Sequence, residues 1–359
     1  MSIKKIKSLV EYDIIETIAE GGMGSVLKAR EKGIEGFEKI VAIKKLLPKY
    51  SKDRRFVSMF VKEAKMVANL VHENIVQIYQ LNKSRNEYFI AMEFVDGISL
   101  HQMILFHDKI GQRFPVNLAV FIASRVARGL AYAHNRRDSN GVPMDIVHCD
   151  ICPHNVLINT EGVAKITDFG IARARSITSS ELDNVFAGKV LFMSPEQAAQ
   201  KGIDFRSDIY SLGMLLFFTL CGNSGRETSG SLHEIAARAI ENQIKWEYLP
   251  ASLDNDLLTL LHRMLSNNPD DRYSNTAELA RDLEYYIYKN GYGPTIVTLS
   301  DYLREQMPGL FSVSSGNSVL PETGDFTIVM DEFKNLKPEV QREYPPKSFW
   351  QNVVARWKK

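Results

Sequence analysis

Residues 146–170 read IVHCDICPHNVLINTEGVAKITDFG, and this stretch decides the fold. Two short β-like runs, 156–159 and 164–167, are joined by a turn that contains a glycine. Runs of this kind predict a β-hairpin, which folds the chain back on itself. We therefore expect Asn155, at the entrance of the hairpin, to lie close to Asp168 at its exit.

Asp150 lies just upstream of the hairpin, so one amide oxygen and two carboxylates should converge at its base. Such oxygen ligands suit Mg²⁺, and a carboxylate beside the ion suits a general base. The pattern H-C-D-x-x-x-x-N followed by D-F-G resembles the catalytic and metal-binding loops of protein kinases. The resemblance implies that Asp150 is the catalytic aspartate and that Asn155 and Asp168 bind the metal. A chance hairpin with scattered acids is the alternative, and further motifs in the expected order argue against it.

The resemblance implies an α+β, two-lobed protein kinase fold. A β-rich N-lobe is expected over residues 1–95 and a helical C-lobe over residues 96–290, where the kinase-like pattern ends. Residues 291–311 still look foldable and are interpreted as a helical extension. Residues 312–359 are interpreted as a linker and C-terminal tail with a short amphipathic segment.

A glycine cluster follows the first predicted strand, and it would let the backbone approach a polyphosphate closely. Taken alone, such a cluster is usually a plain turn. The kinase form is G-x-G-x-x-G-x-V; Gly21, Gly24 and Val26 match it, whereas Ala19 replaces the first glycine. With Gly22, these residues are implied to contact ATP.

Residues 40–44, IVAIK, form a predicted strand that ends in Lys44. By resemblance to the V-A-I-K strand of kinases, Lys44 holds the α- and β-phosphates and Ala42 contacts the nucleotide. Residues 54–70 have helical periodicity, and Glu63 lies among the apolar residues of the inward face. A carboxylate in such surroundings needs a partner. Lys44 is the obvious candidate, and kinases pair these two positions.

Residues 87–95, EYFIAMEFV, predict an apolar strand that ends at a hinge between the lobes. The resemblance implies that Met92 is the gatekeeper beside the adenine pocket and that Glu93 to Val95 supply hinge backbone groups. It also implies that Leu157 contacts the nucleotide. Ordinary core packing is the alternative interpretation of Met92.

Three residues depart from the kinase pattern. Cys149 replaces the arginine that usually precedes the catalytic aspartate, and Cys152 replaces the lysine that normally touches the γ-phosphate. Lys189 replaces a threonine in a segment that, in the kinase fold, packs close to the catalytic aspartate. We predict that Lys189 supplies the missing cation. The alternative is that Lys189 binds acidic groups of a peptide or solvent.

Later motifs follow in kinase order. The segment 188–196 resembles the one ending in A-P-E, and its Glu196 is implied to pair with Arg272. Asp208 is implied to brace the backbone of the catalytic loop. The helix expected over 116–136 is amphipathic. Candidate autophosphorylation sites between the D-F-G and A-P-E motifs are Ser176, Thr178, Ser179 and Ser180.

The composition describes an ordinary globular protein, with 45% hydrophobic and 24% charged residues and a formal net charge of +1. So small a charge indicates no nucleic acid partner. Three cysteines cannot form a disulfide framework, and no signal peptide is recognised, so a cytoplasmic location is expected. Membrane contact is expected only as a minor alternative for the amphipathic segment near the C-terminus, and the oligomeric state stays open.

The expected activity is transfer of the γ-phosphoryl group of ATP to serine or threonine hydroxyls of protein substrates, including autophosphorylation. ATP and Mg²⁺ are the implied cofactors. A pseudokinase, which would act as an ATP-binding switch or scaffold, is the alternative, although the nucleotide, metal and base positions are intact. Lys189 leaves the choice between serine/threonine and tyrosine open.

Overall fold

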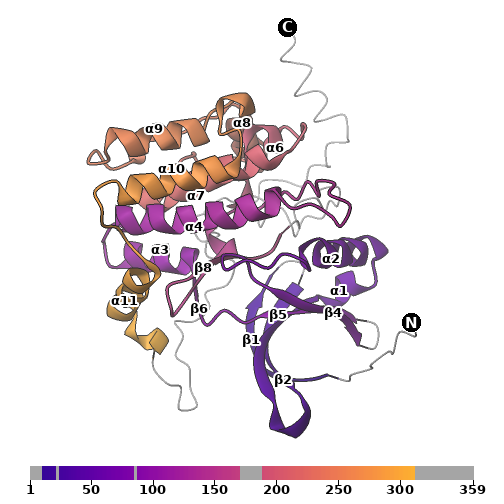
Figure 1. Ribbon diagram of the computed structural model, residues 1–359. Coiled ribbons are helices and arrows are strands. Elements are labelled where there is room, and N and C mark those ends of the chain that lie inside the picture. Colours follow the sequence, from indigo (N-terminus) through magenta and orange to yellow (C-terminus); the bar gives the residue numbers. More distant parts are fainter. Residues whose placement is uncertain (1–9, 22–23, 85–86, 170–187, 312–359) are drawn as a thin grey trace.

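The N-terminal part of the chain forms a five-stranded antiparallel sheet with the order β1-β2-β3-β5-β4, drawn in indigo and violet in Figure 1. The computed structural model describes residues 10–21, 24–84, 87–169 and 188–311. The strands and helices of this lobe are β1 (Glu11–Glu20), β2 (Gly24–Lys32), β3 (Glu38–Leu46), α1 (Pro48–Ser51), α2 (Arg54–Val67), β4 (Ile78–Ser84) and β5 (Glu87–Glu93).

Helix α2 covers this sheet, and the predicted inward face is confirmed. The Asp53 side chain caps the helix by accepting a hydrogen bond of 2.8 Å from the Arg55 backbone N–H. The buried residues of α2 are Phe56, Phe60, Glu63, Ala64 and Val67. The aromatic members pack against strands β3 and β5, so Glu63 is carried to the inner side of the sheet. The helix ends at Val67, before the predicted end at residue 70.

The remaining described elements form a mainly helical lobe. They are β6 (Gly97–Ser99), α3 (Leu100–Lys109), α4 (Val116–His134), β7 (Val156–Asn159), β8 (Ala164–Ile166), α6 (Pro195–Ala198), α7 (Phe205–Cys221), α8 (Leu232–Ile240), α9 (Asn255–Met264), α10 (Thr276–Tyr288) and α11 (Ile296–Gln306).

The predicted hairpin is confirmed as β7 and β8, which pair antiparallel, with β6 as their third strand. Val156 lies opposite Ile166, and the Thr167 backbone N–H donates to the Asn155 carbonyl at 3.0 Å. This bond closes the base of the hairpin. Asn155 and Asp168 therefore flank the same end, as the spacing of the sequence predicted.

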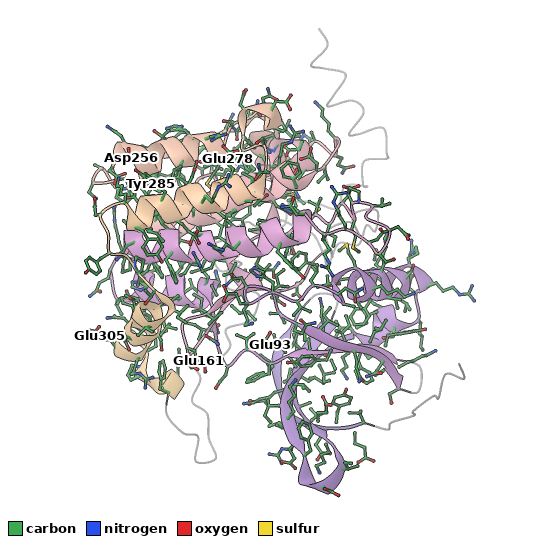
Figure 2. All side chains as sticks on the ribbon, in the orientation of Figure 1. Glu93, Glu161, Asp256, Glu278, Tyr285 and Glu305 are labelled. Carbon is green, nitrogen blue, oxygen red and sulfur yellow. The ribbon has the colours of Figure 1, made fainter. Side chains whose placement is uncertain are left out.

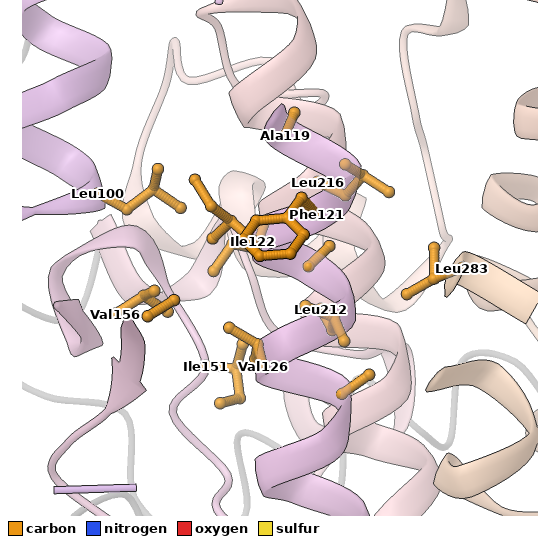
Figure 3. Packing of buried hydrophobic residues seen from close by; sticks show 14 of the residues in the cluster. Leu100, Ala119, Phe121, Ile122, Val126, Ile151, Val156, Leu212, Leu216 and Leu283 are labelled. Atoms are coloured by element: carbon orange, nitrogen blue, oxygen red, sulfur yellow. The ribbon is translucent and has the colours of Figure 1, made fainter. Parts of the chain in front are cut away.

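Helix α4 is the centre of the large core, because it packs against both α7 and α10. Figure 3 shows Ile122 and Val126 of α4 beside Ile151, which directly follows Asp150, and Val156, the first residue of β7. All four side chains are buried. The segment that carries Asp150 is thus fixed to a largely buried helix of the lobe.

Helix α11 lies against the turn of the hairpin. Leu299 and Leu303 are almost completely buried, and the Ser300 hydroxyl donates to the Thr160 carbonyl at 2.6 Å. The Tyr302 hydroxyl and His107 Nε2 of α3 are hydrogen-bonded at 2.9 Å. The foldable extension expected at residues 291–311 therefore contains a helix that supports the hairpin from outside.

Within the described ranges, no helix has both the length and the apolar character required to cross a bilayer. Some expectations fall outside these ranges. They concern Gly22 of the glycine loop, the four candidate phosphorylation sites and the amphipathic C-terminal segment.

Candidate active site

Lys44, at the carboxyl-terminal part of β3, lies between two carboxylates. Its Nζ is 3.0 Å from Glu63 Oε1 on α2 and 2.8 Å from Asp168 Oδ1 after β8. The Lys44 side chain is only 12% exposed, so water screens these contacts little. The structure therefore brings together three residues that are far apart in the sequence, and it joins the N-lobe sheet to α2 and to the hairpin.

The charges of this cluster depend on one another. Burial opposes the ammonium of Lys44, but Asp168 and Glu63 together raise its pKa above the ordinary value. Burial also opposes the ionised form of Asp168, yet Lys44 holds the pKa of that carboxyl below its usual value. The pKa of Glu63 is raised, chiefly by burial. Lys44 and Asp168 are therefore both charged at neutral pH.

Asn155 and Asp168 have the chemistry of a magnesium site. Asn155 Nδ2 donates to the Asp150 carbonyl at 2.7 Å and to Asp150 Oδ2 at 3.1 Å, which turns the amide group so that Oδ1 remains as an acceptor. Asp168 uses Oδ1 for Lys44, and no residue in the described ranges is bonded to its Oδ2. Mg²⁺ is usually held in kinases by one or two such protein oxygens together with nucleotide phosphates. The residues present fit that ion.

Asp150 lies on a loop whose backbone is held by hydrogen bonds to the side chain of Asp208. Asp208 of α7 accepts hydrogen bonds from the backbone N–H groups of His148, at 2.7 Å, and Cys149, at 2.8 Å. This confirms the predicted bracing role of Asp208. His134 Nε2 also contacts Asp208 Oδ2, at 2.8 Å. Cys149 has a left-handed backbone, with φ of 63°, and the two bonds to Asp208 help to hold the loop in that conformation.

Lys189 reaches the loop from the segment that precedes α6. Its Nζ lies 2.5 Å from Asp150 Oδ2, although 39 positions separate the two residues. Burial opposes its charge, but Asp150 raises the pKa of the Lys189 ammonium above the ordinary value. Cys152 lies nearby, and burial raises the pKa of its thiol to about 12. The structure thus places a protonated amine at residue 189 and a neutral thiol at residue 152, two of the three positions where the sequence departs from the kinase pattern.

The residues expected around the nucleotide lie beside the Lys44 cluster. Ala42 pairs with Met92 across β3 and β5, and both are buried in the core beneath the sheet. Val26, Val95 and Leu157 pack against this same core and are partly exposed. Ala19 pairs with Val26 in the β1–β2 hairpin.

The glycine loop and the hinge complete this side of the site. The Gly21 backbone N–H donates to the Gly24 carbonyl at 2.8 Å. A Cβ atom at Gly24 would lie 2.5 Å from the Lys45 carbonyl oxygen, so a side chain does not fit there. The Glu93 side chain binds Lys165 of β8 at 3.0 Å, and Figure 2 shows Glu93 where the two lobes meet.

The predicted pair of Glu196 and Arg272 is confirmed as a bidentate contact, with distances of 2.7 and 2.9 Å. The sequence analysis missed Gln197, whose Nε2 donates to the Cys149 carbonyl at 3.1 Å. The pattern S-x-x-Q at residues 194–197 is a capping-box signal that could have drawn attention to it. It also missed Arg226, which carries no comparable signal because it precedes no recognisable motif.

Comparison with known proteins agrees with this geometry. Residues 12–285 match the family model described as protein kinase domain. The chain is 32% identical over 294 residues to the tyrosine-protein kinase MasK of Myxococcus xanthus, covering 82% of this chain and 45% of that protein. It is 32% identical over 278 residues to the serine/threonine-protein kinase PrkC of Bacillus subtilis, covering 76% of this chain and 40% of PrkC.

The chain therefore spans less than half the length of these curated relatives. Among solved structures, the kinase domain of PknI from Mycobacterium tuberculosis has the same fold, with a TM-score of 0.54 and 24% identity. The match covers 76% of this chain and 95% of the PknI domain. From the family match and the level of identity to its bacterial relatives, this chain belongs to the protein kinase family.

Proposed function

We propose that this protein is an ATP-dependent serine/threonine protein kinase. The observation that carries the proposal is the convergence of Asp150, Asn155 and Asp168 at the base of one hairpin, with Lys44 bound to Asp168. Positioning and charge neutralisation account for most of the catalysis of phosphoryl transfer. The site offers both, because each of its carboxylates lies beside a cation or an amide.

In the proposed reaction, Asp150 orients the substrate hydroxyl and accepts its proton. The hydroxyl oxygen forms a bond to the γ-phosphorus of ATP while the bond from that phosphorus to the bridging oxygen breaks, which releases ADP. Mg²⁺, when held by Asn155 and Asp168, neutralises phosphate charge. Lys44, fixed by Glu63, positions the phosphates, and the loop at residues 21–24 covers them.

Adenine is proposed to bind between the lobes. Val26, Ala42, Met92 and Leu157 line the apolar surface on which the base would lie. The backbone of Glu93 to Val95 would supply its hydrogen bonds, with Glu93 held in place by Lys165. Ala19, Gly21, Gly22 and Gly24 belong to the loop above the phosphates.

Lys189 is proposed to be the cation that replaces the missing lysine at position 152. Its contact with Asp150 at 2.5 Å supports this role, since the γ-phosphoryl group must approach the hydroxyl that Asp150 orients. Binding of acidic peptide groups is the competing role. The two roles differ in what they change, because the first affects kcat and the second affects the KM of the protein substrate.

The rest of the proposal concerns the whole protein. The N-lobe would span residues 1–95, the C-lobe 96–290, the extension 291–311 and the tail 312–359. Protein substrates in the cytoplasm fit a kinase domain with this composition, and the chain's own serines and threonines are included among them. The names of the relatives differ in the acceptor residue, so phosphoamino-acid analysis of the autophosphorylated chain tests the preference.

Incorporation of radiolabelled phosphate from [γ-³²P]ATP tests the activity. We expect transfer by the wild type and a loss of about 10³-fold or more in Asp150→Asn, because the general base is removed. Asp145→Asn is the matched control, since Asp145 is exposed and lies upstream in the same loop. Equal, very low incorporation by all three proteins would instead identify a pseudokinase.

A further inference from the structure

Arg226, in the loop between α7 and α8, is a buried cation with an unusual set of partners. Its side chain is among the largest that are fully buried, with 1% exposure. In the described part of the chain, no carboxylate lies within ion-pairing distance of it, and its Nε has no hydrogen-bond partner. A buried charge of this kind is costly to maintain, so its remaining contacts need an explanation.

Those contacts join one short segment to helix α7. Nη1 of Arg226 donates to the backbone carbonyls of Val190, at 3.0 Å, and Leu191, at 2.9 Å. Nη2 donates to the Tyr210 hydroxyl of α7 at 2.6 Å. The guanidinium therefore ties the two residues that directly follow Lys189 to a helix in the middle of the lobe.

In the described part of the chain, residues 188–190 are helical and a turn follows them. The Phe192 and Met193 N–H groups donate to the carbonyls of Lys189 and Val190. The Val190 and Met193 side chains pack against α8. These apolar contacts set the depth of the segment, whereas the directional hydrogen bonds of Arg226 set the orientation of its carbonyls.

We propose that Arg226 is a positioning residue, which fixes the turn at residues 189–193 so that the Lys189 ammonium stays on Asp150. The proposal rests on the proposed function, because it gives that contact a role in phosphoryl transfer. Kinases more often order this region through a phosphate on the preceding segment. Here Arg226, on the loop between α7 and α8, holds residues 189–193 in place, and no phosphorylation is required.

The test compares Arg226→Met and Arg226→Lys with the wild type, each with Lys189 intact and with Lys189→Ala. Methionine fills the space without donating hydrogen bonds, and lysine can still donate to the two carbonyls. We expect Arg226→Met to lower kcat about 10-fold when Lys189 is present and less than about 2-fold in Lys189→Ala, since both substitutions remove the same contact. Arg226→Lys should recover at least half of the lost activity, and the KM for ATP should stay within about 2-fold.

Arg238→Met is the matched control. Arg238 also donates to two backbone carbonyls, those of Glu227 and Ser229, but it contacts no residue of the turn at 189–193. We expect this variant to keep kcat within about 2-fold of the wild type. Hydrogen exchange gives a readout that needs no activity: the amides of Phe192 and Met193 should exchange at least about 10-fold faster in Arg226→Met and unchanged in Arg238→Met.

Two outcomes would overturn the role of Arg226. One is an equal loss of kcat with and without Lys189, which would describe a merely structural contact. The other is unchanged exchange at Phe192 and Met193 in Arg226→Met. A wild type without Asp150-dependent transfer would instead overturn the proposed function, and the exchange data would still decide whether Arg226 holds the turn.

Discussion

Lys44 and Lys189 both bind a carboxylate at the reaction centre, but they are held there by different means. Lys44 extends from a central strand to two carboxylates, and its side chain is 12% exposed. Lys189 lies in the short helical turn at residues 188–190, is 33% exposed and, among the described residues, forms its ion pair with Asp150. The nucleotide side of the site is therefore anchored by regular elements, whereas the substrate side depends on one turn and the groups behind it.

Apart from the loss of the catalytic Asp150, the largest effect should come from removing the substrate-side cation, Lys189. We expect Lys189→Ala to lower kcat by about 10²-fold or more, with a smaller change in the KM for ATP, because the developing charge on the γ-phosphoryl group loses its partner. Lys44→Ala is the comparison: it should change kcat and the KM for ATP together. Steady-state kinetics at varied ATP measures both. A fully active Lys189→Ala enzyme would show that Lys189, unlike Lys44, has no role in catalysis.

Moving the positive charge from residue 189 to residue 152 also tests whether Lys189 replaces the missing lysine. Cys152→Lys combined with Lys189→Thr restores the usual kinase arrangement, and we expect it to recover much of the activity lost in Lys189→Ala. The two positions should then couple strongly in a double-mutant cycle of kcat values. Additive effects would mean that the charge at residue 189 does not replace the one missing at residue 152.

On the nucleotide side, helix α11 packs against the turn of the β7–β8 hairpin, and a substitution in that turn can disrupt the contact. Gly162, in the turn of the β7–β8 hairpin, has φ of 82°, and a Cβ there would lie 1.9 Å from the Ile296 carbonyl oxygen of α11. Figure 2 shows the neighbouring Glu161 on the side of the molecule where α11 lies. We expect Gly162→Ala to lower the free energy of unfolding by about 3 kcal/mol or more, because backbone must move. Chemical denaturation measures this.

Gly141 provides the control, because its φ of 81° is nearly the same but no atom lies within 4 Å of a Cβ. Gly141→Ala should therefore show the conformational cost alone, about 1 kcal/mol. Equal destabilisation by the two substitutions would indicate that α11 does not support the hairpin.

The smallest effect is expected from the stretch of sequence between the D-F-G and A-P-E motifs. Cys149 cannot pair with a phosphate as the usual arginine does. We therefore predict that alanine at Ser176, Thr178, Ser179 and Ser180 together keeps most of the activity, within about 10-fold of the wild type in kcat. Phosphate incorporation into an added protein substrate measures this. A hundredfold loss would show that another residue, such as Arg173 or Arg175, performs the task of the missing arginine.

The sequence predicted the nucleotide side well, since its signals are local. Strand alternation, the helical face of α2 and the glycine turn of the hairpin each depend on neighbouring residues. The ends were less accurate: α4 ends at His134 rather than at residue 136, and β5 ends at Glu93 rather than at Val95. After Glu93 the chain leaves the sheet and enters the hinge. The end of the strand is therefore set by the tertiary arrangement of the two lobes, which strand propensity does not predict.

By itself, the sequence predicted that Asn155 and Asp168 meet, because the spacing within a hairpin fixes which side chains lie at its base. The candidate nucleotide residues came from the resemblance of several motifs to those of kinases. Only the tertiary structure decided that Lys189 lies on Asp150, that Arg226 is buried behind Lys189 and that α11 closes on Gly162. These contacts join segments 39, 36 and more than 130 positions apart. Their formation depends on the packing of α7, α8 and α11 around the site, and the free energy of such packing is shared by many side chains that no short motif contains.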